Sequence, residues 1–401
     1  MSVLRGKNIL LGVSGGIAAY KTAALVRLLV KSGARVRVVM TPAARDFVTP
    51  LTLSTLSNNP VHWEFYSLEE GSEWNNHVEM GLWADLMIIA PATANTLSKM
   101  ATGNCDNLLV ACYLSAKCPV YFAPAMDLDM YKHPSTLESL ESLKNFGNIV
   151  IPAAFGELAS GLVGEGRMTE PEDIVSFIQK DIESRLPLRG KKILVTAGPT
   201  HEAIDPVRFI GNHSSGKMGF DIANEAASQG AQVVLVSGPV SLSADHPGIE
   251  LVRVTSAQQM LEACQKHFPD CDAAVAAAAV ADFRPVTAAP EKIKKDGATM
   301  EVMLEKTTDI LAWMGTVKQD RFLVGFALET ENEYGNAVSK IKKKNLDLIV
   351  LNSLRDQGSG FGHPTNKVTF IDRELRTEAM ELKSKEAVAR DLIAKIAAHY
   401  E

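Results

Sequence analysis

Apolar runs and helical stretches alternate along the first half of the chain. NILLGV (8–13) and RVRVVM (35–40) flank AYKTAALVRLLVKSG (19–33), in which apolar residues recur at helical spacing and Gly33 is placed to end the helix. The apolar runs ADLMIIAP, LLVACYLSA, PVYFAPAM and NIVIPA come next. Short apolar runs that stop at Gly or Pro are typical of strands buried on both faces. This alternation predicts a parallel, doubly wound sheet.

The pattern restarts near residue 190. Charged residues, a proline and a glycine in DIESRLPLRG (181–190) mark the break, and KKILVTAGPT, QVVLVSGP, FLVGFALET and LDLIVLNS continue the alternation. LRGKKILV (188–195) nearly repeats the earlier LRGKNILL (4–11), but the residues after the two copies differ completely. The similarity of the two segments therefore indicates that each opens a domain with a buried first strand, and it does not indicate an internal repeat. We predict an α/β protein of two different domains, 1–186 and 187–401, each built on a doubly wound, mostly parallel sheet.

Composition excludes several classes of protein. A length of 401 residues suits two domains, and 46% hydrophobic with 22% charged residues is the balance of a soluble globular protein. The net charge of −6 argues against a nucleic-acid partner. The longest apolar stretch (273–281) is shorter than the roughly 20 residues of a membrane helix, and no signal-peptide cleavage site follows the first apolar run. The five cysteines form no CxxC pair, which indicates reduced thiols in the cytoplasm.

Small and hydroxyl-bearing residues follow the predicted strands of the first half. Ser14, Gly15 and Gly16 separate a strand from a helix, where backbone N–H groups can approach a phosphate. A tight structural turn explains these residues equally well, since they do not form GxGxxG. MTPAARDFVTP, APATANTLSKMATG and APAMDLDMYKHP each follow another strand, so we expect them at the carboxyl edge of the sheet, where such folds bind ligands.

The first half resembles the flavin-dependent cysteine decarboxylases through SGGIAAYK, NHVEMGLWAD, APATANT, PAM and GEGRM, in this order. The resemblance implies a flavodoxin-like domain that binds FMN, with His77 as catalytic acid or base. FMN would oxidise the substrate thiol, and the resulting thioaldehyde accepts the electrons left when CO₂ departs. Without the resemblance, a surface histidine that opens an amphipathic helix is the better explanation of His77. The implied FMN contacts are Ser14, Gly15, Gly16, Thr41, Asn95 and Thr96.

Two residues depart from the commonest pattern of these decarboxylases. Asp127 follows PAM, where an asparagine usually binds the substrate carboxylate. An ionised aspartate repels that carboxylate, so either Asp127 is protonated or another group binds it. Ser160 stands in LASGLVGEGRM where many members have the cysteine that protonates the enethiolate, and a hydroxyl is a far weaker acid. Cys105 is the nearest alternative in sequence, but nothing in the sequence places it there.

The second half contains a sequence close to a P-loop. GNHSSGKM (211–218) matches GxxxxGK, but Met218 replaces the Ser or Thr that binds Mg²⁺, and the motif lies well downstream of its strand, so we reject a P-loop. AGPTHEAIDPVRFIGNHSSGKMG instead resembles the phosphopantothenate–cysteine ligases, together with AAAVADFRP, APEKIKK, VGFALET and KKKNLDLIVLN. This resemblance covers nearly all of residues 190–355 and implies a Rossmann-like domain that binds CTP.

The ligase resemblance implies a role for individual residues. Asn212 falls where the family stabilises an acyl-cytidylate, and Lys292 falls on the lysine needed to form it. Thr307 and Thr308 replace the family's more usual Asn-Pro and are weaker candidates. Activating a carboxylate with CTP requires cations, typically Mg²⁺ (or Mn²⁺) and a lysine, but the sequence does not reveal the Mg²⁺ ligands. The implied CTP contacts are Ala276, Ala277, Ala278, Asp282, Phe326, Lys340 and Lys344.

Structural explanations compete with two of these assignments. Lysine runs such as SKIKKKN are usually solvated helix faces. Because this run leads directly into the apolar strand LDLIVLN, Lys340 and Lys344 lie beside a sheet edge, and we favour contacts to a triphosphate. Residues 276–278 also suit close helix–sheet packing, and both explanations can hold. We further expect GSGFGHPTN (358–366) to form a loop over the nucleotide and a final amphipathic helix to complete the domain.

Both halves together resemble the bacterial bifunctional enzymes of coenzyme A biosynthesis. That family implies ligation of 4′-phosphopantothenate to cysteine with CTP, followed by decarboxylation to 4′-phosphopantetheine. It also implies a homo-oligomer, with trimeric contacts in the first half, dimeric contacts in the second and a dodecamer in all. One alternative is an active ligase fused to a flavoprotein that has lost decarboxylase activity, as Asp127 and Ser160 suggest. Another is a regulatory flavin-binding protein, which does not need Asn212 and Lys292.

Overall fold

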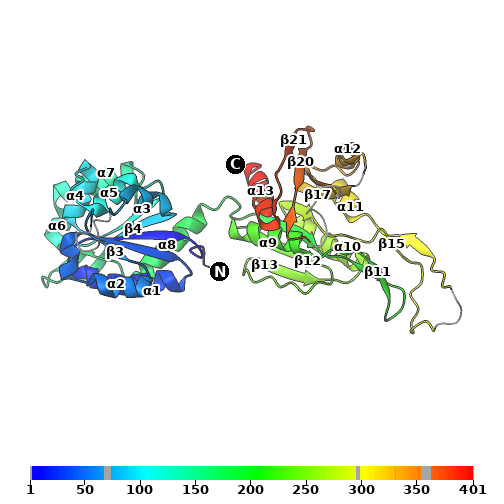
Figure 1. The fold of residues 1–401 in the computed structure, drawn as a ribbon, viewed down its shortest axis with the longest axis horizontal. Helices are drawn as coiled ribbons and strands as arrows, with labels where there is room; N and C mark the ends of the chain where they lie inside the picture. Colours follow the sequence, from blue (N-terminus) through cyan, green and yellow to red (C-terminus); the bar gives the residue numbers. More distant parts are fainter. Residues whose placement is uncertain (1, 67–73, 295–298, 330, 354–362, 401) are drawn as a thin grey trace. The chain divides into compact units, whose positions relative to one another are not determined.

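The computed structural model describes residues 2–66, 74–294, 299–329, 331–353 and 363–400. The chain folds into two compact units, Ser2–Ser184 and Arg185–Glu401, each with its own sheet and its own hydrophobic cores (Figure 1). No helix within the described residues is long and apolar enough to cross a membrane. All five cysteines are free thiols.

A six-stranded sheet forms the centre of the first unit. Its order is β3-β2-β1-β4-β5-β6, and every pairing is parallel. The order reverses between β1 and β4, and open sheets of this kind bind ligands at the carboxyl ends of the strands beside that reversal. The strands are β1 (Asn8–Val13), β2 (Arg35–Met40), β3 (Val61–His62), β4 (Leu86–Ala92), β5 (Val120–Pro124) and β6 (Ile149–Val150), and a separate hairpin is formed by β7 (Ala154–Glu157) and β8 (Val163–Arg167).

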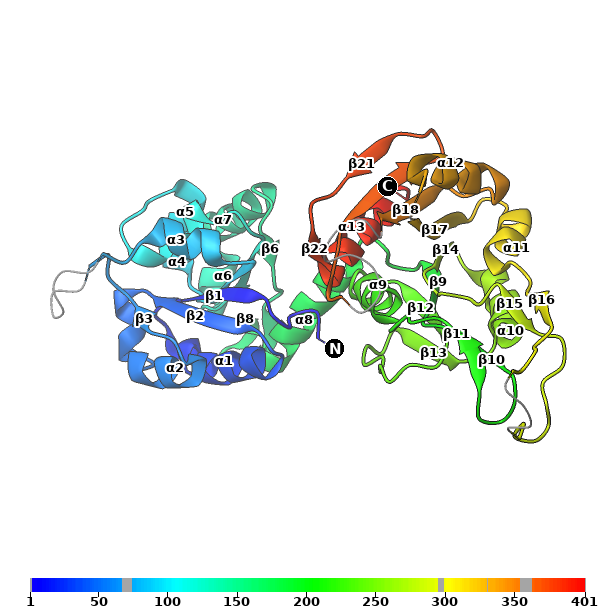
Figure 2. The same ribbon diagram turned by 45° about the vertical axis from the view of Figure 1, so that its right-hand side comes forward.

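Helices cover both faces of this sheet (Figure 2). Successive residues of β1 belong to opposite cores: Ile9 and Leu11 pack under α1, α2 and α8, while Leu10 packs under α3, α4, α5 and α7. Gly33 has a φ of 84° just beyond α1 and ends it as expected. The helices are η1 (Ile17–Lys21), α1 (Thr22–Lys31), η2 (Pro42–Asp46), α2 (Pro50–Ser57), α3 (His77–Trp83), α4 (Ala94–Thr102), α5 (Leu108–Ser115), α6 (Leu128–Lys132), α7 (Pro134–Asn145) and α8 (Pro171–Ser184).

One apolar run of the first half is a helix. LLVACYLSA resembles the strand-like runs around it, but it forms α5, in which residues 108–112 are all buried. Asn107 caps the helix, because its Oδ1 accepts a hydrogen bond from Val110 N at 3.1 Å. A helix buried on every side has no polar face, so its sequence lacks the periodicity that distinguishes a helix from a buried strand.

The second unit contains an eight-stranded sheet of order β13-β12-β9-β14-β17-β18-β20-β21. The first six strands are parallel, and the pairings of β18 with β20 and of β20 with β21 are antiparallel, so the prediction of two mostly parallel α/β sheets is confirmed. Helices α9 and α13 cover one face, and α10, α11 and α12 the other (Figure 2). The sheet strands are β9 (Lys192–Ala197), β12 (Gln232–Ser237), β13 (Ile249–Arg253), β14 (Ala273–Ala276), β17 (Phe322–Glu329), β18 (Leu348–Ser353), β20 (Val368–Asp372) and β21 (Thr377–Ala379). The helices are α9 (Lys217–Ser228), α10 (Ala257–His267), η3 (Phe268–Asp270), α11 (Ile310–Val317), α12 (Glu333–Lys343) and α13 (Lys385–Ala398).

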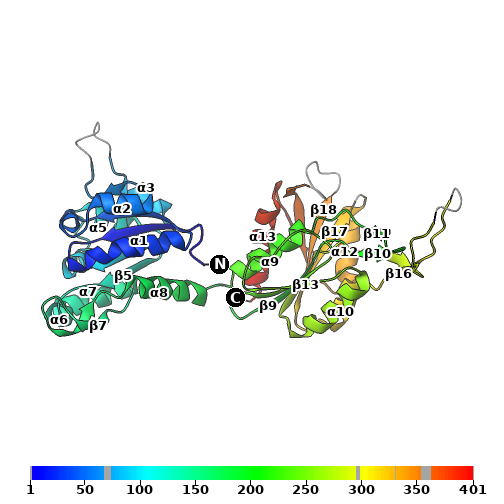
Figure 3. The same ribbon diagram turned by 90° about the horizontal axis from the view of Figure 1, so that it is seen from below.

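Short antiparallel pairs extend this unit beyond its main sheet. The pairs are β10 (His201–Ala203) with β11 (Phe209–Gly211), β15 (Phe283–Pro285) with β16 (Leu304–Lys306), and β19 (Thr365–Asn366) with β22 (Lys383–Ser384). The first two pairs lie side by side (Figure 3). GNHSSGKM therefore follows β11 and not β9, unlike a P-loop. Most of the expected loop at 358–366 lies outside the described residues.

Candidate functional site

The first unit contains a cavity of about 1050 Å³ at the carboxyl edge of its sheet. The loops that follow β1, β2, β4 and β5 form its walls together with the hairpin β7–β8. Ligand pockets commonly measure roughly 300–1,000 Å³, so this cavity has room for a ligand as large as a flavin nucleotide. The residues proposed from the sequence that line it are Gly15, Gly16, Thr41, Asn95, Thr96 and Asp127.

Glycines allow the loop after β1 to approach its neighbours closely. A Cβ atom on Gly15 would lie 2.8 Å from Ala43, and one on Gly16 would lie 3.3 Å from Cγ2 of Thr93. The Thr41 hydroxyl is buried and has no hydrogen-bond partner within the described part of the chain. A buried hydroxyl without a partner in a cavity wall fits a ligand with polar atoms, as FMN is.

Ser14 does not line this cavity. Its side chain is fully buried, donates a hydrogen bond to Pro91 O at 2.7 Å and accepts one from Thr93 N at 3.1 Å. The hydroxyl therefore connects the loop after β1 to the loop after β4. Through this connection, Ser14 positions two loops that do line the cavity.

The two residues that depart from the decarboxylase pattern lie in different places. Asp127 lines the cavity and caps α6, since its Oδ1 accepts a hydrogen bond from Leu128 N at 2.7 Å. Ser160 lies at the exposed tip of the hairpin β7–β8, next to the lining residue Ala159. Cys105 is also exposed, next to another lining residue, Asp106.

His77 lies outside the lining of this cavity. It is the first residue of α3, which Asn76 caps through hydrogen bonds from Val78 N and Glu79 N. The rings of Phe65 and Trp74 lie 6.2 and 6.3 Å from the imidazole ring. Its Nδ1 atom is buried without a partner among the residues that the structure describes. A single chain thus does not bring His77 into the cavity.

A smaller cavity of about 160 Å³ lies in the second unit. The segment that leads into α9, the ends of β14 and β17, and the first residue of α13 line it. Ala277, Ala278 and Phe326, which the ligase resemblance implies as CTP contacts, line this cavity, and Ala276 directly precedes Ala277. Asn212 lies beside this wall, because its Nδ2 donates a hydrogen bond to Ala279 O at 2.8 Å.

Lys340 lies beside this cavity near the end of α12, and Lys344 caps the same helix. Lys340 donates a hydrogen bond from Nζ to the carbonyl of the lining residue Phe326 at 2.8 Å. Burial lowers the pKa of Lys340, and the neighbouring ammonium of Lys344 lowers it further. Lys344 forms an ion pair with Asp309 at 2.6 Å. The carboxylates of Glu329, Asp309 and Asp282 also act on Lys340, so its ammonium lies in a group of mixed charge.

Asp282 and its neighbours connect the strand end to the next segment. The carbonyl of Asp282 accepts a hydrogen bond from Thr307 N at 2.9 Å. The Thr307 hydroxyl donates to Ala281 O at 2.6 Å, and Thr308 is exposed. The Thr307 hydroxyl therefore stabilises the loop, which is a structural role.

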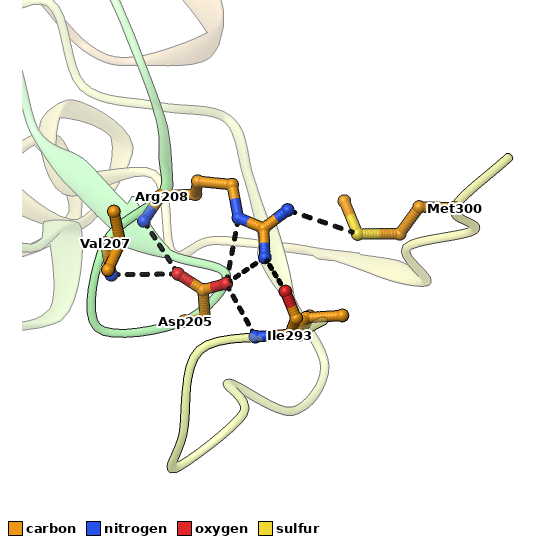
Figure 4. Close-up of polar contacts among 5 residues, drawn as sticks. All are labelled: Asp205, Val207, Arg208, Ile293 and Met300. Carbon is orange, nitrogen blue, oxygen red and sulfur yellow. Dashed lines mark hydrogen bonds and ion pairs between the residues drawn. The ribbon is translucent and has the colours of Figure 1, made fainter. Parts of the chain in front are cut away.

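Lys292 is exposed, and the residue after it is fixed by an ion pair (Figure 4). Asp205, 3% exposed, accepts hydrogen bonds from Ile293 N at 3.2 Å and from Arg208 Nε at 2.8 Å. Arg208 also donates from Nη2 to Ile293 O at 2.8 Å. Burial acts to raise the pKa of Asp205, but these hydrogen bonds outweigh it and hold the pKa well below its usual range. The turn between β10 and β11 thus binds both backbone polar groups of the residue next to Lys292.

Known proteins match both units. Residues 2–183 match the Flavoprotein family, and residues 188–400 match the DNA/pantothenate metabolism flavoprotein C-terminal domain. The coenzyme A biosynthesis bifunctional protein CoaBC of Bacillus subtilis (strain 168) is 43% identical over 398 residues, which cover 99% of this chain and 98% of the relative. This chain belongs to the CoaBC family.

Two further relatives are similar to this chain over most of its length, and one of them is not named CoaBC. CoaBC of Vibrio parahaemolyticus serotype O3:K6 is 45% identical over 403 residues, which cover 99% of each chain. A "Cysteine/Cysteine sulfinic acid decarboxylase" from an unknown prokaryotic organism is 53% identical over 354 residues, which cover 87% of this chain and 98% of the relative.

Membership of the CoaBC family confirms the predicted bifunctional enzyme of coenzyme A biosynthesis. The first unit is its flavoprotein decarboxylase domain, and the second is its ligase domain. The described residues contain no group of three or more His, Cys, Asp or Glu side chains that could bind a metal ion. The metal ligands, which the sequence did not reveal, therefore stay unassigned.

Several residues of both cavities were not predicted from the sequence. Lys21, Lys99 and Arg167 line the first cavity. Lys217 and Lys385 line the second. Lys21 and Arg167 belong to the motifs SGGIAAYK and GEGRM, so their position in a motif was the available signal. Lys385 begins the terminal helix, far along the chain from every motif, and only the fold brings it to the cavity.

Proposed function

We propose that the second unit joins 4′-phosphopantothenate to cysteine at the expense of CTP. The substrate carboxylate attacks the α-phosphate of CTP, pyrophosphate leaves, and an acyl-cytidylate forms. The amine of cysteine then attacks the acyl carbon and releases CMP, which gives 4′-phosphopantothenoylcysteine. The observation that supports this proposal is the partly buried Lys340, which is bonded to Phe326 in the wall of a cavity lined by alanines and by Lys217 and Lys385.

Each residue of the ligase site has a proposed task. Lys292 neutralises charge at the reacting phosphate, and the anchored Ile293 next to it limits where the lysine can reach. The Asn212 amide, oriented by its bond to Ala279 O, stabilises the acyl-cytidylate. Small side chains at 276–278 let the cytosine approach the backbone, and Asp282 completes the nucleotide site. Because the described residues offer no metal-binding group, no step is assigned to Mg²⁺ or Mn²⁺.

We propose that the first unit decarboxylates 4′-phosphopantothenoylcysteine to 4′-phosphopantetheine. A bound FMN would supply a reversible electron acceptor for oxidation of the substrate thiol and for the later reduction that follows loss of CO₂. Gly15, Gly16 and Thr41 would bind the flavin together with Asn95 and Thr96, all of which line the cavity. Asp127, which lines the cavity, would orient the substrate carboxylate, and Ser160 lies at the tip of the hairpin that forms one wall.

The position of His77 supports an oligomeric site. In one chain His77 lies outside the cavity and has a buried, unpartnered Nδ1 in the described structure. We propose that His77 of a second copy reaches the cavity and moves a proton there, as the expected trimer implies. Co-expression of a His77→Asn chain with a Gly15→Ala chain tests this. At an FMN concentration too low to fill the Gly15→Ala cavity, each variant alone should be inactive. Recovery of decarboxylation in the mixed oligomer is expected, and the absence of recovery would contradict the proposal.

A second candidate reaction comes from the relative named a cysteine/cysteine sulfinic acid decarboxylase. The first unit would then decarboxylate free cysteine or cysteine sulfinate, which lack the pantothenoyl arm. The cavity of about 1050 Å³ is larger than such small substrates need beside a flavin, so we favour phosphopantothenoylcysteine. The products differ in mass: 4′-phosphopantetheine in one case, cysteamine or hypotaurine in the other.

Mass spectrometry of the products distinguishes these reactions. The purified full chain is supplied with FMN, Mg²⁺, CTP, 4′-phosphopantothenate and cysteine. We expect 4′-phosphopantetheine, CMP and pyrophosphate. Accumulation of 4′-phosphopantothenoylcysteine would leave the ligase standing and refute the decarboxylase proposal. A parallel reaction with only FMN and cysteine or cysteine sulfinate tests the second candidate.

A further inference from the structure

Lys21 is a buried cation in the wall of the flavin cavity. It ends η1, directly after the loop that follows β1, and is 6% exposed. Its Nζ donates one hydrogen bond to Met168 O at 3.0 Å and another to Glu170 Oε1 at 2.8 Å. A buried ammonium is costly without partners, so a lysine retained here indicates that its two acceptors matter.

Both acceptors lie just beyond the hairpin β7–β8. Arg167, the last residue of β8, donates from Nη2 to the same Glu170 oxygen at 2.7 Å. Glu170 thus bridges a buried lysine of η1 and an arginine of the hairpin. Hydrogen bonds lower the pKa of the Glu170 carboxyl, that from Lys21 most, so the bridge keeps its negative charge at neutral pH. We call Lys21, Arg167 and Glu170 the hairpin anchor.

The hairpin has few other attachments. Among the described residues, β7 and β8 pair only with each other and lie outside the six-stranded sheet. Phe155 and Val163 are 73% and 61% exposed, so these apolar side chains do not join the core. Two further contacts involve glycines: Gly166 O accepts a hydrogen bond from Met126 N at 2.9 Å, and Gly164 lies against Leu128 of α6. Polar bonds at the base of the hairpin therefore decide much of its position.

The hairpin also forms one wall of the cavity. Glu157, Leu158 and Ala159 line it at the end of β7 and in the turn, and Arg167 and Met168 line it at the end of β8 and just beyond. Ser160 lies at the tip between them. We propose that the hairpin anchor holds β7–β8 over the flavin cavity, which makes Lys21 a positioning residue for substrate binding in this unit. The inference rests on the proposed decarboxylase function only for its effect on turnover.

A direct contact between Lys21 and the flavin is the competing explanation, because Lys21 itself lines the cavity. The two explanations differ in what a Lys21→Met variant changes. Loss of an anchor frees the hairpin and weakens substrate binding, while the flavin keeps its other contacts. Loss of a flavin contact weakens FMN binding and leaves the hairpin as protected as before.

The test uses the full chain with Lys21→Met, Glu170→Gln and, as matched control, Lys31→Met, an exposed lysine at the end of α1. Hydrogen exchange of residues 154–167, FMN affinity from flavin fluorescence, and KM and kcat of decarboxylation are measured. For Lys21→Met we expect hairpin exchange and KM to rise about tenfold, with FMN affinity changed less than about twofold. Glu170→Gln should change the same quantities in the same direction by less, and Lys31→Met should change none.

Either of two results would overturn the anchor. One is weaker FMN binding by Lys21→Met with unchanged hairpin exchange, which makes Lys21 a flavin ligand. The other is no change in hairpin exchange for Lys21→Met or Glu170→Gln. If Lys21→Met does not fold, Glu170→Gln decides, since the 44% exposed Glu170 can be replaced without opening the core. If the wild-type chain does not decarboxylate, exchange and FMN affinity still test the anchor, so the two proposals fail separately.

Discussion

The two units begin with the same local structure and then diverge. Leu4 and Leu188 open them, and both side chains are fully buried. Two residues later, Gly6 and Gly190 have φ values of 76° and 77°, a left-handed conformation that favours glycine. The repeated LRGK is therefore the same turn, used twice to start a buried first strand.

The similarity extends to how each first strand is joined to its neighbour. Asn8 N donates to Asp85 Oδ2 at 2.7 Å, and Lys192 N donates to Asp272 Oδ2 at 2.8 Å. Each aspartate directly precedes the strand next to the first one, β4 or β14. A strand start, its turn and its carboxylate partner are thus shared by two domains of different chemistry.

The divergence comes after the first strand. In the first unit, Gly15 and Gly16 lead directly into η1, and the cavity at this edge is large and lined by several neutral groups. In the second, β10 and β11 intervene before α9, and the smaller cavity gathers lysines from distant segments. The comparison teaches that the sheet supplies an edge, while the segments after its strands set the size and lining of the cavity: about 1050 Å³ in the first unit and about 160 Å³ in the second.

The largest expected effect comes from the removal of a cation, Lys292, in the second unit. Lys292→Gln should reduce the rate of acyl-cytidylate formation about 100- to 1,000-fold, because it removes a positive charge where negative charge develops. Decarboxylation of supplied 4′-phosphopantothenoylcysteine should stay unchanged. Pyrophosphate release measures the first step. The control is Lys342→Gln, an exposed lysine of α12; an equal loss in both variants would mean that only net charge matters.

A steric change at Gly15 tests whether the close approach of two loops in the first unit is needed for FMN binding. Gly15→Ala places a methyl group 2.8 Å from the Ala43 backbone, so two loops of the cavity must separate. We expect FMN to bind about 10- to 100-fold more weakly, with ligase activity unaffected. Flavin fluorescence titration measures this. Gly156→Ala is the control, since its new Cβ would meet only the Arg167 side chain at 3.5 Å. An equal loss of FMN affinity in both variants would show that the close approach of Gly15 to Ala43 does not determine FMN binding.

The pH dependence of nucleotide binding tests Lys340. Its pKa is lowered from the ordinary value of 10.5 by burial and by Lys344. Lys340 is charged below its pKa and neutral above it, so CTP affinity should be highest at lower pH. Affinity should fall by up to about tenfold per unit as the pH rises through the lowered pKa. Calorimetric titrations measure the profile, and Lys340→Arg, which stays charged, should flatten it. A wild-type profile as flat as that of the arginine variant would remove Lys340 from the site.

The smallest effect concerns the unpartnered hydroxyl of Thr41. Thr41→Val keeps the shape and removes an oxygen that has no partner in the described chain. FMN affinity should fall about fivefold, the value of one ordinary hydrogen bond, while the flavin-free protein should be no less stable. Thermal unfolding with and without FMN measures both. Destabilisation of the flavin-free protein would show that the hydroxyl has a structural partner instead.

Sequence patterns predict some parts of this molecule better than others. Strands buried on both faces and an amphipathic helix such as α1 leave clear periodicities, and the glycine turn after β1 leaves a motif. The helix α5 does not, because burial on every side removes its polar face. The family motifs locate residues that line each cavity, since those residues lie on loops after predicted strands.

The pattern of apolar and polar residues does not predict contacts between residues that are far apart in the sequence. The ion pair of Asp205 and Arg208 with the backbone of Ile293 joins segments about 85 residues apart. Lys21 and Met168 are likewise joined across 147 positions. No periodicity encodes such pairs, because they depend on how the elements pack and not on the local chain. His77 illustrates a different limit, since one chain does not contain its proposed partner surface.

The twin opening turns have a consequence for how such a gene can change. The backbone bonds that close each turn come from its own unit, such as Gly6 N to Gly33 O and Leu188 N to Gln229 O. The stretch between Ser184 and Leu188 is therefore a domain boundary, and the turn and first strand of the second unit follow it complete. Evolution can divide or fuse the coding sequence there, and each enzyme keeps a first strand able to begin its own sheet.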